Sequence, residues 1–585
     1  MSIVLSKEQL VYVQSFGKVI LNACPGSGKT TTVAYKLDEL IKNWELLFSK
    51  NSGILCLSFT NVAKNEIAEK FKEKNGFSLP YPHYILTIDS FVNSFITLPF
   101  AHKLKDIGKR YKIIDDISYL DKIFQSDWQL MKTYKSYLFS YKPSKIDYTI
   151  NSGYSWDGHD KSDDLDFVKY AKEIKTRQIN MGLLKTSDSA FLAYLILKKY
   201  PRIAKYIASK FPYLIIDEAQ DTSEIQHSIL ELLYNQGLKN IDLVGDPYQC
   251  LYQWRDASPE LFLQKFDDCE NWKGLYLTEN RRSTKKIIEV FSMLRRTTDK
   301  EIIPILDSEA DLPLHVIKYD KTDYSEAISK YEKLCLDNNL SSNIILVRGN
   351  ALKNSLLGKE SDYFPWDKSS IAYKLIQSRI HLQSNEIKEA VKKIRRLIIE
   401  LLIPGISFSD LKEKENELKN DKDSNSIIFK IVRDIPSFDL SLKEWTVKTQ
   451  QYLKSELQLE NMPDFKIRKK NVTKKGKITF DKTTLENSVN HYFKKAITEN
   501  NFPITTIHQV KGMTFDSVFM ILNDKNHKEN ITLNDFVLKE EMPTEKQRLI
   551  YVAISRPRNL LCIGVPKTMT DEKLKEFLNC EMLIL

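Results

Sequence analysis

One short stretch of the chain combines residues that can hold a phosphate group. Gly26 and Gly28 allow the backbone to wrap an oxyanion without Cβ clashes, and Lys29 supplies a point charge for β- and γ-phosphates. The Thr30 hydroxyl is suited to Mg²⁺. The full stretch, which leads on to Thr31, is Ala23-Cys24-Pro25-Gly26-Ser27-Gly28-Lys29-Thr30. It predicts a phosphate-binding loop, the alternative being a chance match in a glycine-containing turn.

Such a loop needs a strand before it and a helix behind it, because the backbone N–H groups at a helix N-terminus point at the anion. Residues 19–23 form a short apolar run that predicts the strand. Apolar residues then recur at helical spacing at Val33, Leu37, Leu40 and Ile41. Both required elements are therefore predicted.

A second apolar run, residues 213–216, ends in the adjacent acids Asp217 and Glu218. Asp217 is placed to hold Mg²⁺ and Glu218 to polarise an attacking water. Two acids at a strand end are common by chance. Downstream of a phosphate loop, they predict the second half of an ATPase site.

A third strand, predicted at residues 241–244, leads into a stretch with a different chemistry. Gln249 can bridge a γ-phosphate and the rest of the protein. Tyr252, Trp254 and Arg255 combine aromatic planes with a cation, on which unpaired bases can stack. The alternative is that these rings belong to the core.

Composition sets broad limits. The chain has 585 residues, enough for three or four domains, and its net charge of +10 fits either a polyanionic partner or plain solubility. Seven cysteines without a Cys-x-x-Cys pair predict buried free thiols in a reducing compartment, and no zinc site. Neither a signal peptide nor a membrane-spanning run is apparent, so we expect a cytoplasmic protein without membrane association.

Alternating strands and helices predict an α/β fold with two parallel-sheet regions, each interrupted by a mostly helical insertion. The first region comprises residues 1–96 and 206–276, and its insertion is 97–205, with a polar loop from Lys142 to Asp164. The second comprises 277–375 and 495–585, and its insertion is 376–494.

The second insertion contains two further features. One amphipathic helix is predicted from the shared face of Ile387, Val391, Ile394, Ile398 and Leu401. The most basic segment of the chain lies between Lys466 and Lys477. This segment has two possible interpretations: a solvated loop, or a contact with duplex phosphates.

The ordered set of these stretches resembles superfamily 1 helicases of the UvrD/Rep/PcrA group. The further matching stretches are 6–9, 59–61, 87–91, 277–283, 504–516 and 545–556. The resemblance implies two RecA-like P-loop NTPase domains, with ATP and Mg²⁺ as cofactors. It also implies single-stranded DNA and 3′-tailed duplex DNA as partners, and 3′-to-5′ movement driven by ATP hydrolysis.

The resemblance also implies roles for single residues. Gln9 corresponds to the adenine-reading glutamine, and Arg281 and the phosphate loop to further nucleotide contacts. Lys29, Glu218, Gln249, Arg282 and Arg556 correspond to the catalytic set, in which the two arginines reach the γ-phosphate from the second α/β region. Thr30 and Asp217 correspond to the magnesium ligands. The implied DNA-binding residues are Phe59, Asn61, Thr87, Tyr252, Trp254, Arg255, Thr506 and His508.

Several residues depart from the family pattern. Arg281 stands where a tyrosine usually stacks on adenine, so stacking here would be by a guanidinium. Thr514 replaces the usual glutamate that contacts the ribose, and Ile88-Asp89 replaces an aromatic residue and histidine. Nucleotide preference and one DNA contact therefore stay open.

Only about thirty residues follow Arg556, so we expect no nuclease-like or partner-docking domain after the last motif. Compact relatives of this kind include the helicase-like subunit of the Gabija anti-phage system, which works with a separate nuclease. A role in defence or DNA repair, with a separate nuclease partner, is thus an expectation. The alternatives are a DNA-stimulated ATPase that senses DNA for a nuclease with little unwinding, and an ATPase unrelated to nucleic acid.

Overall fold

The computed structural model describes most of the chain and groups it into two compact units. One unit comprises Met1–Gly349 with Ile504–Leu585, and we call it the two-sheet unit; the other, Asn350–Pro503, is the inserted unit. The finer four-domain boundaries stay a prediction. The described residues are 4–114, 117–251, 257–306, 311–320, 323–356, 365–366, 370–383, 387–403, 406, 408–461, 465–468, 471–474, 477–480, 485–493, 502–524, 530–538 and 542–585.

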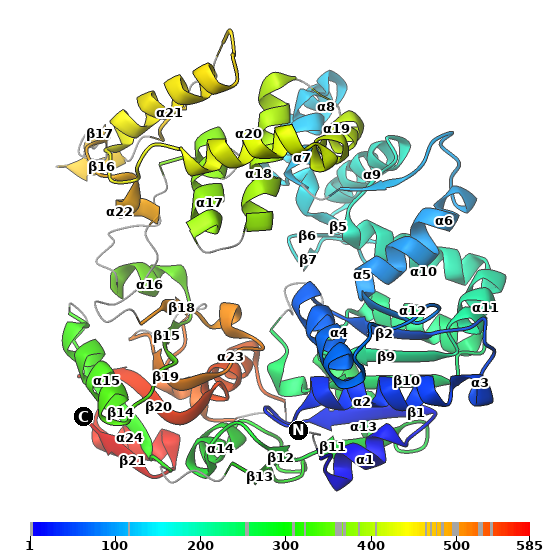
Figure 1. Ribbon diagram of the computed structural model, residues 1–585, viewed down its shortest axis with the longest axis vertical. Coiled ribbons are helices and arrows are strands. Elements are labelled where there is room, and N and C mark those ends of the chain that lie inside the picture. Colours follow the sequence, from blue (N-terminus) through cyan, green and yellow to red (C-terminus); the bar gives the residue numbers. More distant parts are fainter. Residues whose placement is uncertain are drawn as a thin grey trace. The chain divides into compact units, whose positions relative to one another are not determined.

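The first sheet of the two-sheet unit has six parallel strands in the order β11-β1-β10-β9-β2-β3 (Figure 1). All of the strands predicted for this region are present. Their bounds are β1 Lys18–Ala23, β2 Ile54–Ser58, β3 Tyr84–Thr87, β9 Tyr213–Asp217, β10 Asn240–Gly245 and β11 Lys273–Leu277.

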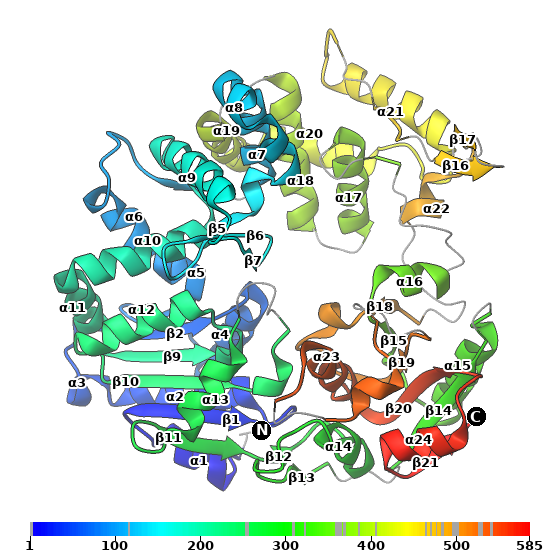
Figure 2. The same cartoon turned by 180° about the vertical axis from the view of Figure 1, so that it is seen from behind.

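Helices cover both faces of this sheet, which is why its central strands β2 and β9 are largely apolar and buried along their whole length. Along β2, Ile54 and Cys56 pack on one face, while Leu55 and Leu57 pack on the other. The first face is covered by α1 (Lys7–Val13), α2 (Lys29–Lys42) and α4 (Asn61–Asn75). The second is covered by α12 (Glu224–Asn235) and α13 (Pro259–Asp267), in front of the strands in Figure 2. Helix α4 begins after Thr60, whose hydroxyl caps it by accepting a hydrogen bond from the Ala63 N–H at 3.1 Å.

The second sheet also has six parallel strands, in the order β18-β15-β19-β20-β14-β21. Their bounds are β14 Leu314–Tyr319, β15 Asn343–Val347, β18 Ile504–Thr506, β19 Phe515–Ile521, β20 Pro557–Pro566 and β21 Met582–Ile584. Helices α14 (Lys285–Ser292), α23 (Glu545–Ile554) and α24 (Asp571–Leu578) cover one face. On the other face, Tyr331 of α15 (Ser325–Asp337) packs on Phe519 with ring centroids 5.0 Å apart.

The segment between the two six-stranded sheets contains a separate two-stranded sheet. After β11, β12 (Glu279–Asn280) pairs with β13 (Ile303–Pro304). Cys24, Tyr248 and Leu251 follow strands of the first sheet but lie in the hydrophobic core of the second. The two α/β halves thus share part of one core.

The insertion between β3 and β9 is mostly helical. The principal helices are α5 (Ile88–Phe91), α7 (Ser118–Ser126), α8 (Trp128–Ser140), α9 (Leu165–Asn180), α10 (Thr186–Lys199) and α11 (Pro201–Lys210). The prediction of a polar loop from Lys142 to Asp164 was wrong. Three short strands form an antiparallel sheet there: β5 (Ile146–Tyr148), β6 (Tyr154–Trp156) and β7 (His159–Asp160). Aromatic packing explains why this segment is ordered despite its polar composition. The ring of Tyr148 in β5 stacks on the ring of Phe191 in α10, with centroids 4.3 Å apart.

The inserted unit is described by itself. It contains α16 (Asn350–Leu356), α17 (Ile371–Gln383), α18 (Ile387–Leu402), α19 (Phe408–Asn420), α20 (Lys422–Arg433), α21 (Leu442–Glu456) and α22 (Val489–Phe493). The predicted amphipathic helix is α18, whose Ile394, Ile398 and Leu401 are buried with Trp366 and Trp445. In the basic segment, β16 (Asn471–Lys474) and β17 (Lys477–Phe480) form a hairpin, while residues 469–470 and 475–476 lie outside the described part.

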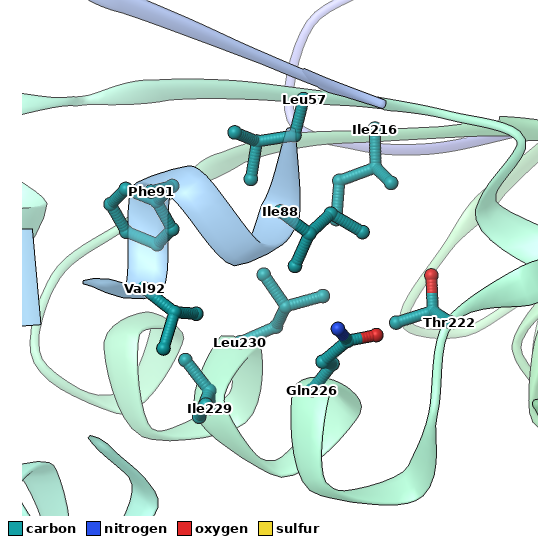
Figure 3. A pocket seen from close by; sticks show the side chains of 9 residues that line it. All are labelled: Leu57, Ile88, Phe91, Val92, Ile216, Thr222, Gln226, Ile229 and Leu230. Carbon is teal, nitrogen blue, oxygen red and sulfur yellow. The ribbon is translucent and has the colours of Figure 1, made fainter. Parts of the chain in front are cut away.

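A small cavity lies against the first sheet, between α5 and α12 (Figure 3). Its walls are apolar except for Thr222 and Gln226, and its space is at the lower limit for one water molecule. Ile88 points into this cavity, so this departure from the family pattern is a core residue here.

The structure bears on two predictions, that of free thiols and that of no membrane-spanning segment. All seven cysteines are free, and five of them are buried: Cys24, Cys56, Cys250, Cys335 and Cys562. Among the helices that the structure describes, none has both the length and the apolar character needed to cross a membrane.

We predict an acid-sensitive contribution to stability from His227. It lies on α12, is 2% exposed, and neither ring nitrogen has a hydrogen-bond partner among the described residues. Burial, and next Lys265, lower the pKa of His227 from 6.5 to about 3, so the folded state keeps the ring neutral while the unfolded chain binds a proton. This contribution is fully present above pH 6.5 and is lost as the pH falls below it, by about 2 kcal/mol at pH 5.

His227→Leu should therefore reduce the drop in Tm between pH 7.5 and pH 5, as measured by calorimetry. The control is His159→Leu, which changes an exposed histidine. Equal drops for wild type and His227→Leu would contradict the assignment.

Candidate nucleotide-binding site

A pocket of about 470 Å³ lies where the carboxyl ends of the first sheet's strands meet. The strand register brings Leu21 beside Val244 and Val244 beside Asp217, so the ends of β1, β10 and β9 lie next to one another. Loops of the second sheet complete the wall. Its lining residues include Cys24–Thr31, Asp217, Glu218 and Gln249 from the first half, and Arg282, His508, Lys511 and Arg556 from the second.

The phosphate loop has the predicted strand–turn–helix form. Ala23 ends β1 and Lys29 begins α2, with Gly28 at the N-cap in the left-handed region (φ 79°). Gly26 has φ 72°, and a Cβ there would lie 2.6 Å from the Cβ of Arg282. Glycine is therefore required at residue 26 both by the backbone conformation and by the close approach of the second half.

Glu218 is held ionised by lysines from both halves of the two-sheet unit. Lys29 Nζ lies 3.9 Å from Glu218 Oε1, and Lys511 Nζ lies 3.7 Å from Oε2. Burial alone would raise the pKa of Glu218, but Lys29 and Lys511 reverse this and lower it. Glu218 also has a positive φ of 56°, which is rare outside glycine and is found at functional sites.

The neighbouring carboxyl groups are in a different state. Burial, reinforced by Glu218, raises the pKa of Asp217. Burial raises the pKa of Asp221 to about 6 even though Lys511 forms an ion pair with it. On the pocket wall, burial likewise raises the pKa of Glu66, which is hydrogen-bonded to Thr30.

Thr30 and Asp217 fit a magnesium ion. Asp217 Oδ1 is buried and has no hydrogen-bond partner in the described part of the chain. Oxygen donors in this number suit Mg²⁺, which takes one or two protein ligands and completes its octahedron with phosphate oxygens and water. The described residues contain no group of three or more His, Cys, Asp or Glu side chains that could hold a metal.

Two arginines from the second half line the pocket, where Arg556 is buried and Arg282 is half-buried. Arg556 Nη2 donates to Gln249 Oε1 at 2.6 Å, and Arg282 Nη1 donates to the Ser555 carbonyl at 3.1 Å. Burial lowers the pKa of both groups, and the Arg282 guanidinium helps to bring that of Arg556 to about 9. Among the described residues neither arginine forms an ion pair with a carboxylate, so their charges favour an anion in the pocket.

A chain of hydrogen bonds connects Glu218 to Arg556. Gln220 Nε2 donates to Glu218 Oε2 at 2.5 Å, and Gln220 Oε1 accepts the Asp246 N–H at 3.1 Å. Asp246 Oδ2 accepts from Gln249 Nε2 at 2.7 Å, and Gln249 accepts from Arg556. No role was predicted from the sequence for Gln220, Asp246, Lys511 or Glu66. Lys511 lies in the matching stretch 504–516, while Gln220 and Asp246 closely follow predicted strands. These positions were the available signal.

The other predicted nucleotide contacts lie around the loop. Gln9 Nε2 donates to the Ser27 carbonyl at 3.1 Å, and its Oε1 accepts the Ser6 N–H in a capping box. The Arg281 N–H donates to the Gly26 carbonyl at 3.1 Å, while its partly exposed side chain pairs with Glu279. Thr31 lines the pocket. Gln9 and Arg281 are thus adjacent to the phosphate loop.

The predicted DNA-binding residues are only partly brought together. Phe59 and His508 line the nucleotide pocket itself, and burial, with Arg348 next, lowers the pKa of His508. Asn61 is exposed at the start of α4, and Thr506 ends β18. The Thr87 hydroxyl is engaged locally, because it caps α5 by accepting the Ser90 N–H at 3.1 Å. Tyr252, Trp254 and Arg255 lie outside the described residues.

Fold and site together define a class of protein. Two parallel α/β sheets, with a phosphate loop at the carboxyl edge of the first and pocket-lining arginines supplied by the second, are the arrangement of a P-loop NTPase with two RecA-like domains. Sequence profiles agree: that of the UvrD/REP helicase N-terminal domain matches residues 5–270, and that of the UvrD-like helicase C-terminal domain matches residues 407–568. The chain belongs to the UvrD-like helicases.

Individual relatives extend over nearly the whole chain. Gabija protein GajB of Bacillus cereus (strain VD045) is 24% identical over 605 residues, covering 99% of this chain and 98% of GajB. ATP-dependent DNA helicase Rep of Buchnera aphidicola subsp. Schizaphis graminum is 24% identical, covering 93% of this chain and 90% of Rep. ATP-dependent DNA helicase PcrA of Staphylococcus epidermidis is 22% identical, with 94% and 81% covered.

We predict that Lys511 supports both turnover and stability. Lys511→Gln would leave Glu218 and Asp221 buried without their shared cation, a change that costs about 3–5 kcal/mol in buried pairs. ATP turnover should fall by at least about tenfold and Tm should decrease. The matched control is Lys567→Gln, which removes a half-exposed ion pair with Glu326. Turnover and Tm equal to those of the control would refute the role.

Proposed function

We propose that the chain is an ATP-dependent 3′-to-5′ DNA helicase or translocase that binds single-stranded DNA and couples ATP hydrolysis to movement or strand separation. The main support is the pocket itself. Lys29 lines it from the first half, and Arg282 and Arg556 line it from the second. A triphosphate bound there would contact both halves at once.

Each residue has a chemical part in this proposal. Lys29 and the N-terminus of α2 bind the β- and γ-phosphates, and Glu218, kept ionised by its lysines, accepts a proton from the attacking water. Arg282 and Arg556 stabilise the negative charge that develops, an effect worth roughly 10³–10⁵ in rate for an arginine finger. When bound between Thr30 and Asp217, Mg²⁺ would neutralise phosphate charge.

Hydrolysis can drive movement because the site needs both halves. Loss of the γ-phosphate removes the anion that Arg282, Arg556 and Lys29 share, so the two α/β halves can separate and close again with the next ATP. If each half grips the strand in turn, closure and reopening become steps along DNA. The proposed grip consists of the eight DNA-binding positions named above, and the 3′-to-5′ polarity rests on the family resemblance.

The proposed partners are single-stranded and 3′-tailed duplex DNA, in the cytoplasm. Similarity to Gabija protein GajB over nearly the full length of both chains supports a role in anti-phage defence, with a separate nuclease as partner. It also favours a second candidate function, a DNA-stimulated ATPase that regulates such a nuclease and unwinds little duplex by itself.

Lys29→Ala tests the ATPase assignment. Removing the ammonium group should abolish ATP hydrolysis stimulated by single-stranded DNA, measured as phosphate release, because the γ-phosphate loses its main point charge. Binding of a fluorescent oligonucleotide should remain measurable. Hydrolysis at the wild-type rate would show that the site has been misassigned.

Trp254→Ala tests the nucleic-acid assignment. Loss of one stacked base should weaken single-strand binding by about tenfold or more, measured by fluorescence anisotropy, with Tm unchanged. Unchanged affinity would favour an ATPase that does not act on nucleic acid. Strand-separation assays on 3′-tailed duplex, with RNA in parallel, distinguish the helicase from the regulatory ATPase, which would hydrolyse ATP strongly without unwinding.

A further inference from the structure

Tyr248 belongs by sequence to the first half but is buried in the core of the second. It lies in the 3₁₀ turn η5 (Pro247–Gln249), directly before Gln249, and is 0% exposed. Its ring lies 5.5 Å from that of Tyr551 on α23, and the Arg295 guanidinium lies over the ring at 5.5 Å. The turn that carries Gln249 is therefore anchored in the second half.

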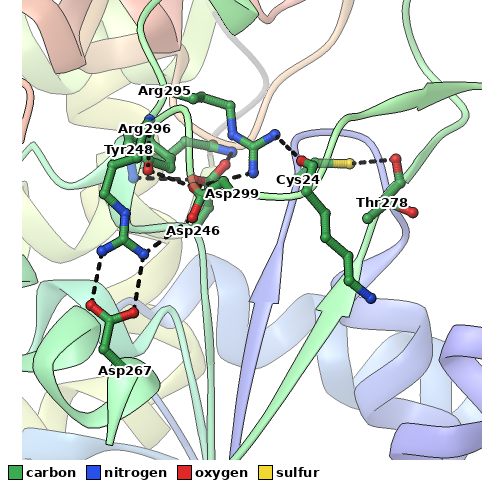
Figure 4. Close-up of polar contacts among 10 residues, drawn as sticks. Cys24, Asp246, Tyr248, Asp267, Thr278, Arg295, Arg296 and Asp299 are labelled. Carbon is green, nitrogen blue, oxygen red and sulfur yellow. Dashed lines mark hydrogen bonds and ion pairs between the residues drawn. The ribbon is translucent and has the colours of Figure 1, made fainter. Parts of the chain in front are cut away.

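The Tyr248 hydroxyl is paired as well as buried. It donates to Asp299 Oδ2 at 2.5 Å and accepts the Arg296 N–H at 3.2 Å (Figure 4). Asp299 is itself buried and also pairs with Arg295 and Arg296. The loop after α14 thus surrounds the hydroxyl with charged groups whose positions are mutually fixed.

The same loop also reaches back to the first half. Arg296 makes a forked ion pair with Asp267 at the end of α13, with distances of 2.9 and 3.3 Å (Figure 4). Tyr248 of the first half contacts residues of the second half, and Arg296 of the second half contacts Asp267 of the first. These two contacts, made in opposite directions at one place, hold the halves together there.

Tyr248 is directly followed in the chain by Gln249, which lines the nucleotide pocket. Asp246 Oδ1 accepts the Tyr248 N–H at 3.0 Å, while Oδ2 of the same carboxylate holds Gln249 at 2.7 Å. Gln249 in turn accepts from Arg556. Any displacement of Tyr248 by the second half must therefore change the position of the Gln249 amide.

We infer that Tyr248 is a positioning residue: its hydroxyl, locked to Asp299 and Arg296, makes the position of Gln249 follow the rotation of the second half. This inference rests on the proposed ATPase function. It assigns the hydroxyl a role distinct from that of the ring, since phenylalanine would fill the same apolar space without making the polar contacts.

The test is a double-mutant cycle of Tyr248→Phe and Gln249→Ala in the full chain. With saturating single-stranded DNA, Tyr248→Phe should lower kcat by about tenfold, with little change in KM for ATP. Because Tyr248 acts through Gln249, adding Tyr248→Phe to Gln249→Ala should lower kcat no further. Multiplying effects would overturn the inference.

Tyr319→Phe is the matched control. Its hydroxyl is also buried in the second half, where it donates to the Leu522 carbonyl at 2.7 Å, away from the pocket residues. The two single variants should have similar Tm values, and only Tyr248→Phe should lower kcat. Equal kcat values would refute the positioning role. If Tyr248→Phe folds poorly, Asp299→Asn, which keeps the shape of the acceptor, replaces it under the same criteria.

Hydrogen exchange separates this inference from the proposed function. Tyr248→Phe should speed amide exchange in residues 246–251 without nucleotide or DNA, whereas Tyr319→Phe should not. Unchanged exchange there would contradict the anchoring. A wild-type chain without DNA-stimulated hydrolysis would instead refute the proposed function, and the exchange result would still decide whether the hydroxyl anchors the turn.

Discussion

The pairing of buried charges between the two halves is the constraint on which the site depends. Lys29 and Lys511 come from different halves, and both keep Glu218 ionised in a place where burial alone would favour its neutral form. Among the described residues, the half-buried Arg282 and the buried Arg556 form no ion pair with a carboxylate. The pocket thus contains an ionised carboxylate and two guanidinium groups. In the proposed function, the carboxylate accepts a proton from the attacking water and the guanidinium groups bind the triphosphate.

The fold places these charges through simple geometry. Parallel strands bring their carboxyl ends to one edge, so the phosphate loop after β1, the acids after β9 and the turn after β10 become neighbours. The second sheet faces this edge with the segment after β18 and with Arg556, which directly precedes β20. Cys24, Tyr248 and Leu251 of the first half pack in the core of the second half. The site and the contact between the halves are therefore built from the same few turns.

Sequence reasoning was most successful where a feature depends on adjacent residues. The phosphate-loop strand and helix and the amphipathic helix α18 follow from local spacing, and each is present. It failed between Lys142 and Asp164, where a polar composition concealed three short strands that pack through aromatic rings. Thr87 shows a further limit, because one hydroxyl can cap a helix or contact a ligand and its residue type does not distinguish the two.

The sequence by itself determined the class of chemistry: a phosphate loop, a strand-end acid pair and an ordered set of motifs typical of one helicase family. Only the tertiary structure decided which distant side chains meet. Lys511 pairs with Asp221 across 290 residues, and Arg556 bonds Gln249 across 307. Spacing along a chain encodes local periodicity, whereas such contacts depend on how two sheets pack. For that reason, only the three-dimensional structure identified the partners of Glu218 and the burial of Tyr248 in the core of the other half.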